Sequence, residues 1–237
     1  MTRGEIIRFL VLRTIGNFLL LFAIFGVLAT FGPSLYFELH YRIAQARGVE
    51  YSAPEETDSA FGELLKKTNP EKIADGGFGK LLAGPKEQIL IPKDTDFSIL
   101  IPKIGASAKV IPNIDPSNEA QFLEVLQQGV AHALGTYFPG LPGNIYLFAH
   151  STDNFWDVGR YNAVFYLLKD LAPGDDVIVY FENQRHNYVV TEIRTVDASD
   201  VSYITKSNTG KEVLILQTCW PPGTTWKRIL VFAEPKK

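Results

Sequence analysis

The amino-acid sequence predicts a mainly β domain, a closed barrel of about eight strands with short helices, attached to an N-terminal transmembrane helix. Two observations lead to this fold class. Residues 14–37 form a long run without a single charged side chain. After residue 86 the chain divides into short runs rich in Ile and Val, which Pro and Gly separate. Many short strands with few helices are typical of a barrel rather than of a parallel α/β sheet.

The uncharged run 14–37 is long enough to cross a membrane. As a helix it would measure roughly 36 Å, whereas the hydrocarbon core is about 30 Å thick. Arg3, Arg8 and Arg13 precede the run, so the positive-inside rule places residues 1–13 in the cytoplasm. We therefore expect a single-pass membrane protein with the rest of the chain on the extracytoplasmic face.

A cleaved signal peptide is the main alternative to an uncleaved anchor, because Ala44-Gln45-Ala46 resembles a signal-peptidase site. However, the apolar run is much longer than the signal-peptide core of about 7–15 residues, and a bulky, charged segment separates it from these alanines. A buried core helix rarely runs this far without a charge. The sequence favours an uncleaved anchor.

Residues 38–85 are predicted to form an extracytoplasmic stalk. From residue 48 this segment is rich in Ser, Pro, Glu, Lys and Gly, and a short helix is expected near 59–67. The folded domain is expected to span 86–237. Within it we predict one helix from an N-cap at Ser117 through Leu126, and a second over 161–168. The predicted strands are 88–92, 97–104, 109–114, 144–149, 176–181, 188–196, 212–217 and 228–233.

Composition excludes several classes of protein and site. The net charge of −3, without a basic patch, argues against a nucleic-acid-binding protein. Cys219 is the only cysteine, which excludes an intramolecular disulfide and a zinc site built on several thiolates. Asp153, Asp157 and Glu182 are too scattered to indicate a calcium site. We predict no metal and no other cofactor.

Cys219 is the first candidate for chemistry, because it ends the strand-like run 212–217 where a loop with Pro221-Pro222 begins. Such a position exposes the sulfur while the strand fixes it, as a nucleophile requires. Outside the cytoplasm most cysteines are paired, so a lone one indicates a reactive or intermolecular thiol. The ordinary alternative is a buried cysteine that packs as a small hydrophobe.

His150 and Arg228 are the other two candidates. His150 ends the run 144–149, and Arg228 opens the strand that follows the Cys219 loop. Strand ends at one rim of a barrel would bring imidazole, thiol and guanidinium together for proton transfer and oxyanion stabilisation. Taken singly, His150 fits an ordinary loop histidine and Arg228 a solvated edge residue. At three strand ends of one chain, they favour function.

Three further residues are assigned smaller roles. His132 is predicted to line or support the site. Trp220 and Trp226 are expected to flank it, either in contact with a ligand or as anchors of their loop. The remaining histidines, His40 and His186, are expected to have no role in the site.

These residues resemble the sortase family. Its members have a T-L-x-T-C motif at a strand end, which corresponds here to Ile215-Leu216-Gln217-Thr218-Cys219. They also have a histidine that ends an earlier strand, here His150, and an arginine on the next strand, here Arg228. Residues 129–144 resemble the loop before the histidine strand, and the resemblance extends over about 86–235. Ile215 departs from the motif's first Thr, which affects the subclass more than the mechanism.

The resemblance implies a cysteine transpeptidase. Cys219 would attack a Thr-Gly-like bond in a C-terminal sorting signal, and His150 would give a proton to the leaving amine. Arg228, backbone N–H groups and Thr218 would hold the oxyanion. The implied partners are surface proteins with LPxTG-like signals and an amine acceptor such as a peptidoglycan precursor, at the membrane.

Other functions remain open at this point. An anchored cysteine hydrolase needs the same residues and differs only in its acceptor. A pilus-assembling sortase is a further alternative, although 48–85 has no obvious Asp-Pro-aromatic lid motif. A silent binding barrel would bury Cys219. Papain-like amidases place cysteine before histidine on a helix, unlike this chain.

Overall fold

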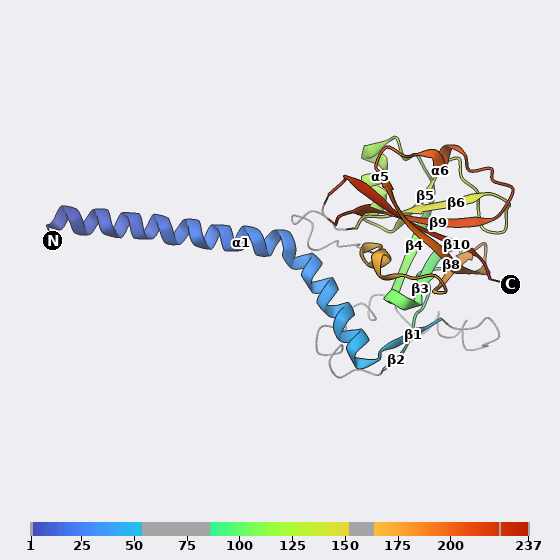
Figure 1. Ribbon diagram of the computed structural model, residues 1–237, viewed down its shortest axis with the longest axis horizontal. Helices are drawn as coiled ribbons and strands as arrows, with labels where there is room; N and C mark the ends of the chain where they lie inside the picture. The colour runs from blue at the N-terminus through green and yellow to red at the C-terminus, as the bar shows by residue number, and fades with distance from the viewer. Residues whose placement is uncertain (1, 54–85, 152–163, 223, 237) are drawn as a thin grey trace.

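The computed structural model describes residues 2–53, 86–151, 164–222 and 224–236. Figure 1 shows one long helix, α1, that projects away from a barrel of strands. Around the barrel the strands follow the order β10-β8-β7-β3-β4-β5-β6-β9, and β9 pairs with β10 to close it. The predicted closed barrel of about eight strands is therefore confirmed. Its strands are β3 (Phe97–Ile101), β4 (Ala106–Ile114), β5 (Val130–Ala133), β6 (Asn144–Phe148), β7 (Asp176–Phe181), β8 (Gln184–Asp197), β9 (Val213–Trp220) and β10 (Lys227–Pro235).

One predicted strand lies outside the barrel and one barrel strand was not predicted. The run 88–92 becomes β2 (Glu87–Ile89), which pairs in parallel with β1 (Glu50–Ser52) in a separate two-stranded sheet. Its place in the barrel goes to β5, whose four residues include His132 and are too short to give a strand pattern. The sequence did not predict these pairings, because paired strands are far apart in the chain.

The barrel interior is filled by alternate residues of its strands. Leu147 of β6, Leu216 of β9 and Val231 of β10 are completely buried and occupy neighbouring register positions. Because side chains alternate along a strand, the residues between them face outward. Phe148 is one of these, and its ring meets Phe122 of α5 (Glu119–Leu126) edge-on at 6.1 Å. Helix α5 therefore lies over the outer face of β6.

The short helices differ from their predicted bounds. Helix α5 begins after Asn118, whose side chain accepts a hydrogen bond from the Gln121 N–H at 3.2 Å. Ser117 is not the N-cap, because its hydroxyl donates to Asp115 instead. The predicted helix 161–168 overlaps a 3₁₀ helix, η3 (Tyr166–Asp170), and 161–163 lie outside the described residues. Another 3₁₀ helix, η1 (Pro102–Ile104), and α6 (Ser202–Thr205) were not predicted.

Helix α1 (Arg3–Arg47) contains the predicted anchor and continues past it. Its segment Arg3–Ala29 is long and apolar enough to cross a membrane. At the other end Glu38 forms an ion pair with Lys169 of η3 at 2.9 Å, and Tyr41 packs against the barrel core. Residues 38–47 are therefore helical and packed on the barrel. The predicted stalk segment 54–85, with its helix near 59–67, lies outside the described residues.

Candidate active site

Three adjacent strands place His150, Cys219 and Arg228 at one rim of the barrel. Strand β9 lies between β6 and β10 in the barrel order. β6 runs parallel to β9 with Phe148 opposite Gln217, so His150 and Cys219 each follow two residues beyond this pair. β10 runs antiparallel to β9, and Arg228 is the direct register partner of Cys219. The two strand directions expected from the sequence bring the three residues to one level, with the thiol in the middle.

Cys219 lies on the outer face of the barrel. Leu216 and Thr218 are buried on the interior side of β9, so Gln217 and Cys219 face outward. Cross-strand partners share a face, which puts the Arg228 side chain next to the thiol. Cys219, Arg228 and His150 are all half-buried. Cys219 is therefore not a completely buried core cysteine.

Burial raises the pKa of the Cys219 thiol above its usual value, and the Arg228 guanidinium opposes this by favouring the thiolate. Burial is the larger of the two effects. Burial therefore favours the neutral thiol form of Cys219. The candidate proton acceptor for this thiol is the imidazole of His150, because the β6–β9 register puts His150 at the level of Cys219.

Arg228 is held at the start of β10 by its own loop. Its Nη1 donates to the Thr225 and Lys227 carbonyl oxygens, each at 3.1 Å. A guanidinium has five N–H donors, and within the described residues these bonds use only those of one nitrogen. The other guanidinium nitrogens are therefore not engaged by the described part of this loop.

Thr218 does not face the site, which corrects its predicted part in holding the oxyanion. The side chain is only 2% exposed, and its hydroxyl donates to the Ala149 carbonyl oxygen at 3.1 Å. The Ala149 N–H in turn donates to the Gln217 carbonyl at 3.1 Å. These two bonds join β9 to the residue just before His150, so Thr218 supports the site from inside the barrel.

His132 does not line the site either. It is completely buried opposite Leu147, inside the barrel, with its ring 4.4 Å from that of Phe138. Its Nδ1 accepts from the Asn113 N–H at 3.3 Å, so the ring proton is on Nε2, which is 3.0 Å from the Tyr137 carbonyl oxygen. Burial lowers the pKa of His132, and the ring is neutral. His132 therefore supports the core of the barrel rather than the site.

The two tryptophans beside the site differ in exposure. Trp220 is half-buried and packs against the barrel core, as a loop anchor would. Trp226 is 74% exposed and lies two residues before Arg228. A contact of either ring with substrate stays a prediction. Asp153 and Asp157, in the loop after His150, lie outside the described residues.

Tyr146 and Gln217 were not predicted to belong to the site. Both are on the outer face, and the Tyr146 hydroxyl donates to Gln217 Oε1 at 3.2 Å. Burial raises the pKa of Tyr146, so it stays a neutral donor. This bond joins β6 to β9 on the outer face, two residues before Cys219. Gln217 could have been identified from the sequence, because side chains two residues apart on a strand share a face and Cys219 was already a candidate. Tyr146 could not, because its place beside Gln217 depends on the register of β6 against β9.

Comparison with known proteins gives one family. The sortase domain model matches residues 99–236, more than half of the chain. Sortase D of Bacillus subtilis (strain 168) is 28% identical over 137 residues, 56% of this chain. That match spans 60% of the relative's length, less than two thirds of it.

Solved structures give the same fold. The Pilus Island 1 Sortase C2 of Group B Streptococcus superposes with a TM-score of 0.50 at 26% identity, over 60% of this chain and 73% of that chain. A Sortase D5 transpeptidase of Clostridium perfringens gives a TM-score of 0.50 at 23% identity, over 75% and 94% of the two chains.

Proposed function

The chain belongs to the sortase family, and from this premise we propose that it is a membrane-anchored cysteine transpeptidase that uses Cys219, His150 and Arg228. One observation carries the proposal: the three residues lie at one level on adjacent strands, with Arg228 in direct register with Cys219. A structural cysteine has no need of a guanidinium and an imidazole on its two neighbours. The oxyanion donors and proton carrier of acyl transfer do need this arrangement.

In the first half-reaction, His150 accepts the Cys219 S–H proton as the sulfur attacks the carbonyl carbon of a Thr-Gly-like bond in a sorting signal. The S–C bond forms, and the carbonyl electrons move to oxygen, where Arg228 and backbone N–H groups stabilise the charge. Collapse of this intermediate breaks the C–N bond, and His150 donates a proton to the leaving amine. The products are a thioester on Cys219 and a released C-terminal fragment.

In the second half-reaction, an amine attacks the thioester carbonyl carbon. His150 accepts the amine's proton as the new C–N bond forms. The C–S bond then breaks, and the departing sulfur takes up the proton from His150. The enzyme returns to its starting state, and the substrate protein is joined to the acceptor.

The proposed location follows from α1. Arg3, Arg8 and Arg13 favour a cytoplasmic N-terminus, which places the barrel outside. There it meets surface proteins with LPxTG-like signals and an acceptor such as a peptidoglycan precursor. Residues 38–47 pack on the barrel, so the helix that contains the anchor also contacts the folded domain.

The test uses the full chain in detergent micelles, because α1 is packed on the barrel. A quenched fluorescent peptide with an LPxTG-like signal is incubated with an added amine, and Cys219→Ser is the matched control. We expect an amine-linked product that the control does not form. Cleavage without amine incorporation would support the anchored hydrolase instead. No reaction with several signals and amines, together with a thiol that resists alkylation, would leave a binding barrel.

A further inference from the structure

A bulge interrupts strand β4 opposite His132 of β5. The register between the two strands is regular up to Ile111 and resumes at Ile114, with one residue fewer on β5 in between. Pro112 and Asn113 therefore share the single opposite residue His132. Pro112 has no N–H to donate, and Asn113 has a φ of 59°, in the left-handed region. The ladder between β4 and β5 is broken at these two residues.

The His132 ring takes the place of the interrupted ladder. Its Nδ1 accepts the Asn113 N–H at 3.3 Å, and its Nε2 lies 3.0 Å from the Tyr137 carbonyl oxygen. Nε2 is also 3.0 Å from Thr136 Oγ1, whose own proton is donated to the Ala133 carbonyl oxygen at 2.8 Å. The Nε2–H therefore donates to both oxygens. One ring thus holds β4 through an acceptor and the segment that leads into β6 through a donor.

A second proton on this ring would act on one side only. Neutral imidazole has one donor and one acceptor nitrogen, whereas imidazolium has two donors. A proton on Nδ1 would face the Asn113 N–H, so a contact between two donors would replace that bond. The Nε2–H keeps its bonds to Tyr137 and Thr136. Protonation therefore separates His132 from β4 and leaves it bound to the segment before β6.

The closed barrel disfavours the charged ring. The side chain is 0% exposed, the Phe97 and Phe138 rings lie 5.8 and 4.4 Å from it, and Leu147 is its register partner on β6. Burial lowers the pKa of His132, and the bond to Tyr137 opposes this to a smaller extent. Among the residues that the structure describes, no charged side chain contributes to this shift of the pKa. The ring therefore takes up a proton readily only after the barrel opens beside it.

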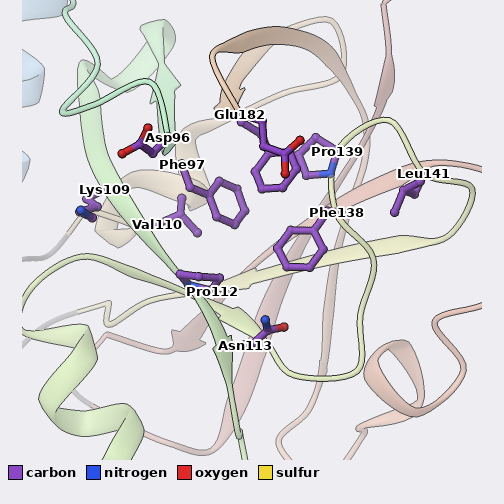
Figure 2. A pocket seen from close by; sticks show the side chains of 11 residues that line it. Asp96, Phe97, Lys109, Val110, Pro112, Asn113, Phe138, Pro139, Leu141 and Glu182 are labelled. Atoms are coloured by element: carbon purple, nitrogen blue, oxygen red, sulfur yellow. The ribbon is translucent and has the colours of Figure 1, made fainter.

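The bulge has room to open. Pro112 and Asn113 are exposed, and both line a cavity of about 630 Å³ (Figure 2). Because neither side chain is part of the core, the bulge can move away from His132 at little cost in apolar burial. The charged residues of the cavity wall are Asp96, Lys109, which is paired with Asp94 at 3.2 Å, and Glu182. Histidine is the side-chain type whose charge ordinarily changes between pH 5 and 8, so His132 rather than these residues responds to mild acid.

We propose that the His132 ring and the Asn113 N–H form an acid-sensitive latch between β4 and β5. When the bulge opens, water reaches Nδ1, and the ring takes up one proton from the solvent. The charged ring no longer accepts the Asn113 N–H, so the bulge stays open while the segment before β6 stays bound. The latch goes beyond the proposed transpeptidation and does not depend on Cys219.

The test is amide hydrogen exchange, followed by NMR on the full ¹⁵N-labelled chain in detergent micelles at pH 7.5, 6.5 and 5.5. Each protection factor is corrected for the intrinsic pH dependence of exchange. The opened ring takes up one proton with the ordinary histidine pKa of about 6.5, so the protection factor of the Asn113 N–H should fall about tenfold between pH 7.5 and 5.5. The Tyr146 N–H, which donates to Thr136 Oγ1 at 3.4 Å, should change by less than about twofold, because this side of the ring stays bound.

Two variants assign the effect to one histidine. His132→Gln has no titrating ring, so the protection factor of Asn113 should no longer depend on pH. His186→Gln, which removes a half-buried histidine of β8, is the matched control and should keep the wild-type dependence. An Asn113 protection factor that does not change with pH, or that changes equally in His132→Gln, would overturn the latch. An equal fall at Tyr146 would do so too, since the whole barrel then opens, and this comparison within the wild-type chain needs no folded variant.

Discussion

Replacing Thr218 with valine tests whether the interior of the barrel positions His150. Valine has nearly the shape of threonine but has no hydroxyl, so it cannot donate to the Ala149 carbonyl oxygen, now 3.1 Å from Thr218 Oγ1. The side chain is 2% exposed, so water cannot readily replace the lost donor. The change removes one bond of the connection between β9 and the residue before His150.

The magnitude follows from that bond. A buried carbonyl left without a partner costs about 1–3 kcal/mol, so the free energy of unfolding should fall by about this amount. For a domain of this size Tm should fall by about 2–4 °C per kcal/mol. The imidazole segment is then less firmly held. Because a displacement of about 1 Å in a catalytic group can cost about a hundredfold in rate, we expect kcat to fall by about ten- to a hundredfold.

Thr218→Ser is the matched control, because it keeps the hydroxyl and loses one methyl group. Removal of a buried methyl costs about 0.5–1.5 kcal/mol, a loss comparable to that in the valine variant. Urea unfolding and peptide transfer are measured on both variants. We expect similar stability but near wild-type kcat only in the serine variant. If both variants lose stability and keep kcat within about twofold of each other, Thr218 has only a structural role.

Two further predictions concern the charges at the rim and inside the core. Arg228→Gln should lower the rate of transfer by about a hundred- to a thousandfold, the usual effect of losing an oxyanion donor. It should also shift Cys219 alkylation by iodoacetamide to higher pH, because the guanidinium no longer lowers the thiol pKa; an unchanged pH profile would contradict this. For His132, whose pKa burial lowers, the unfolded chain takes up a proton first as pH falls below about 6.5, so stability is lost on acidification. His132→Gln should reduce that loss by up to about 1.4 kcal/mol per pH unit in urea unfolding at pH 7.5, 6.5 and 5.5, and equal slopes in both proteins would refute the assignment.

Much of the fold was encoded locally, in residues near one another in the chain. The uncharged run 14–37 predicted an apolar helix, because hydropathy over one helix length is a local property. Strand β7 was predicted to the residue, because Pro173-Gly174 precede its Ile- and Val-rich run and the polar residues Glu182-Asn183 follow it. Strand β5 was missed, and β2 was placed in the barrel, because pairing partners are distant in sequence.

For the candidate site, the sequence by itself determined which side chains were available. A single cysteine at a strand end, a histidine at another and an arginine on the following strand needed no coordinates to be selected. Only the tertiary structure decided at which height along the barrel each residue lies and whether its side chain points inward or outward. The parallel β6–β9 and antiparallel β9–β10 registers align Cys219 with Arg228 and direct Thr218 inward, away from the oxyanion. The reason is physical, since a shift of one residue in register reverses the face of every side chain, and register is fixed by contacts between strands rather than along them.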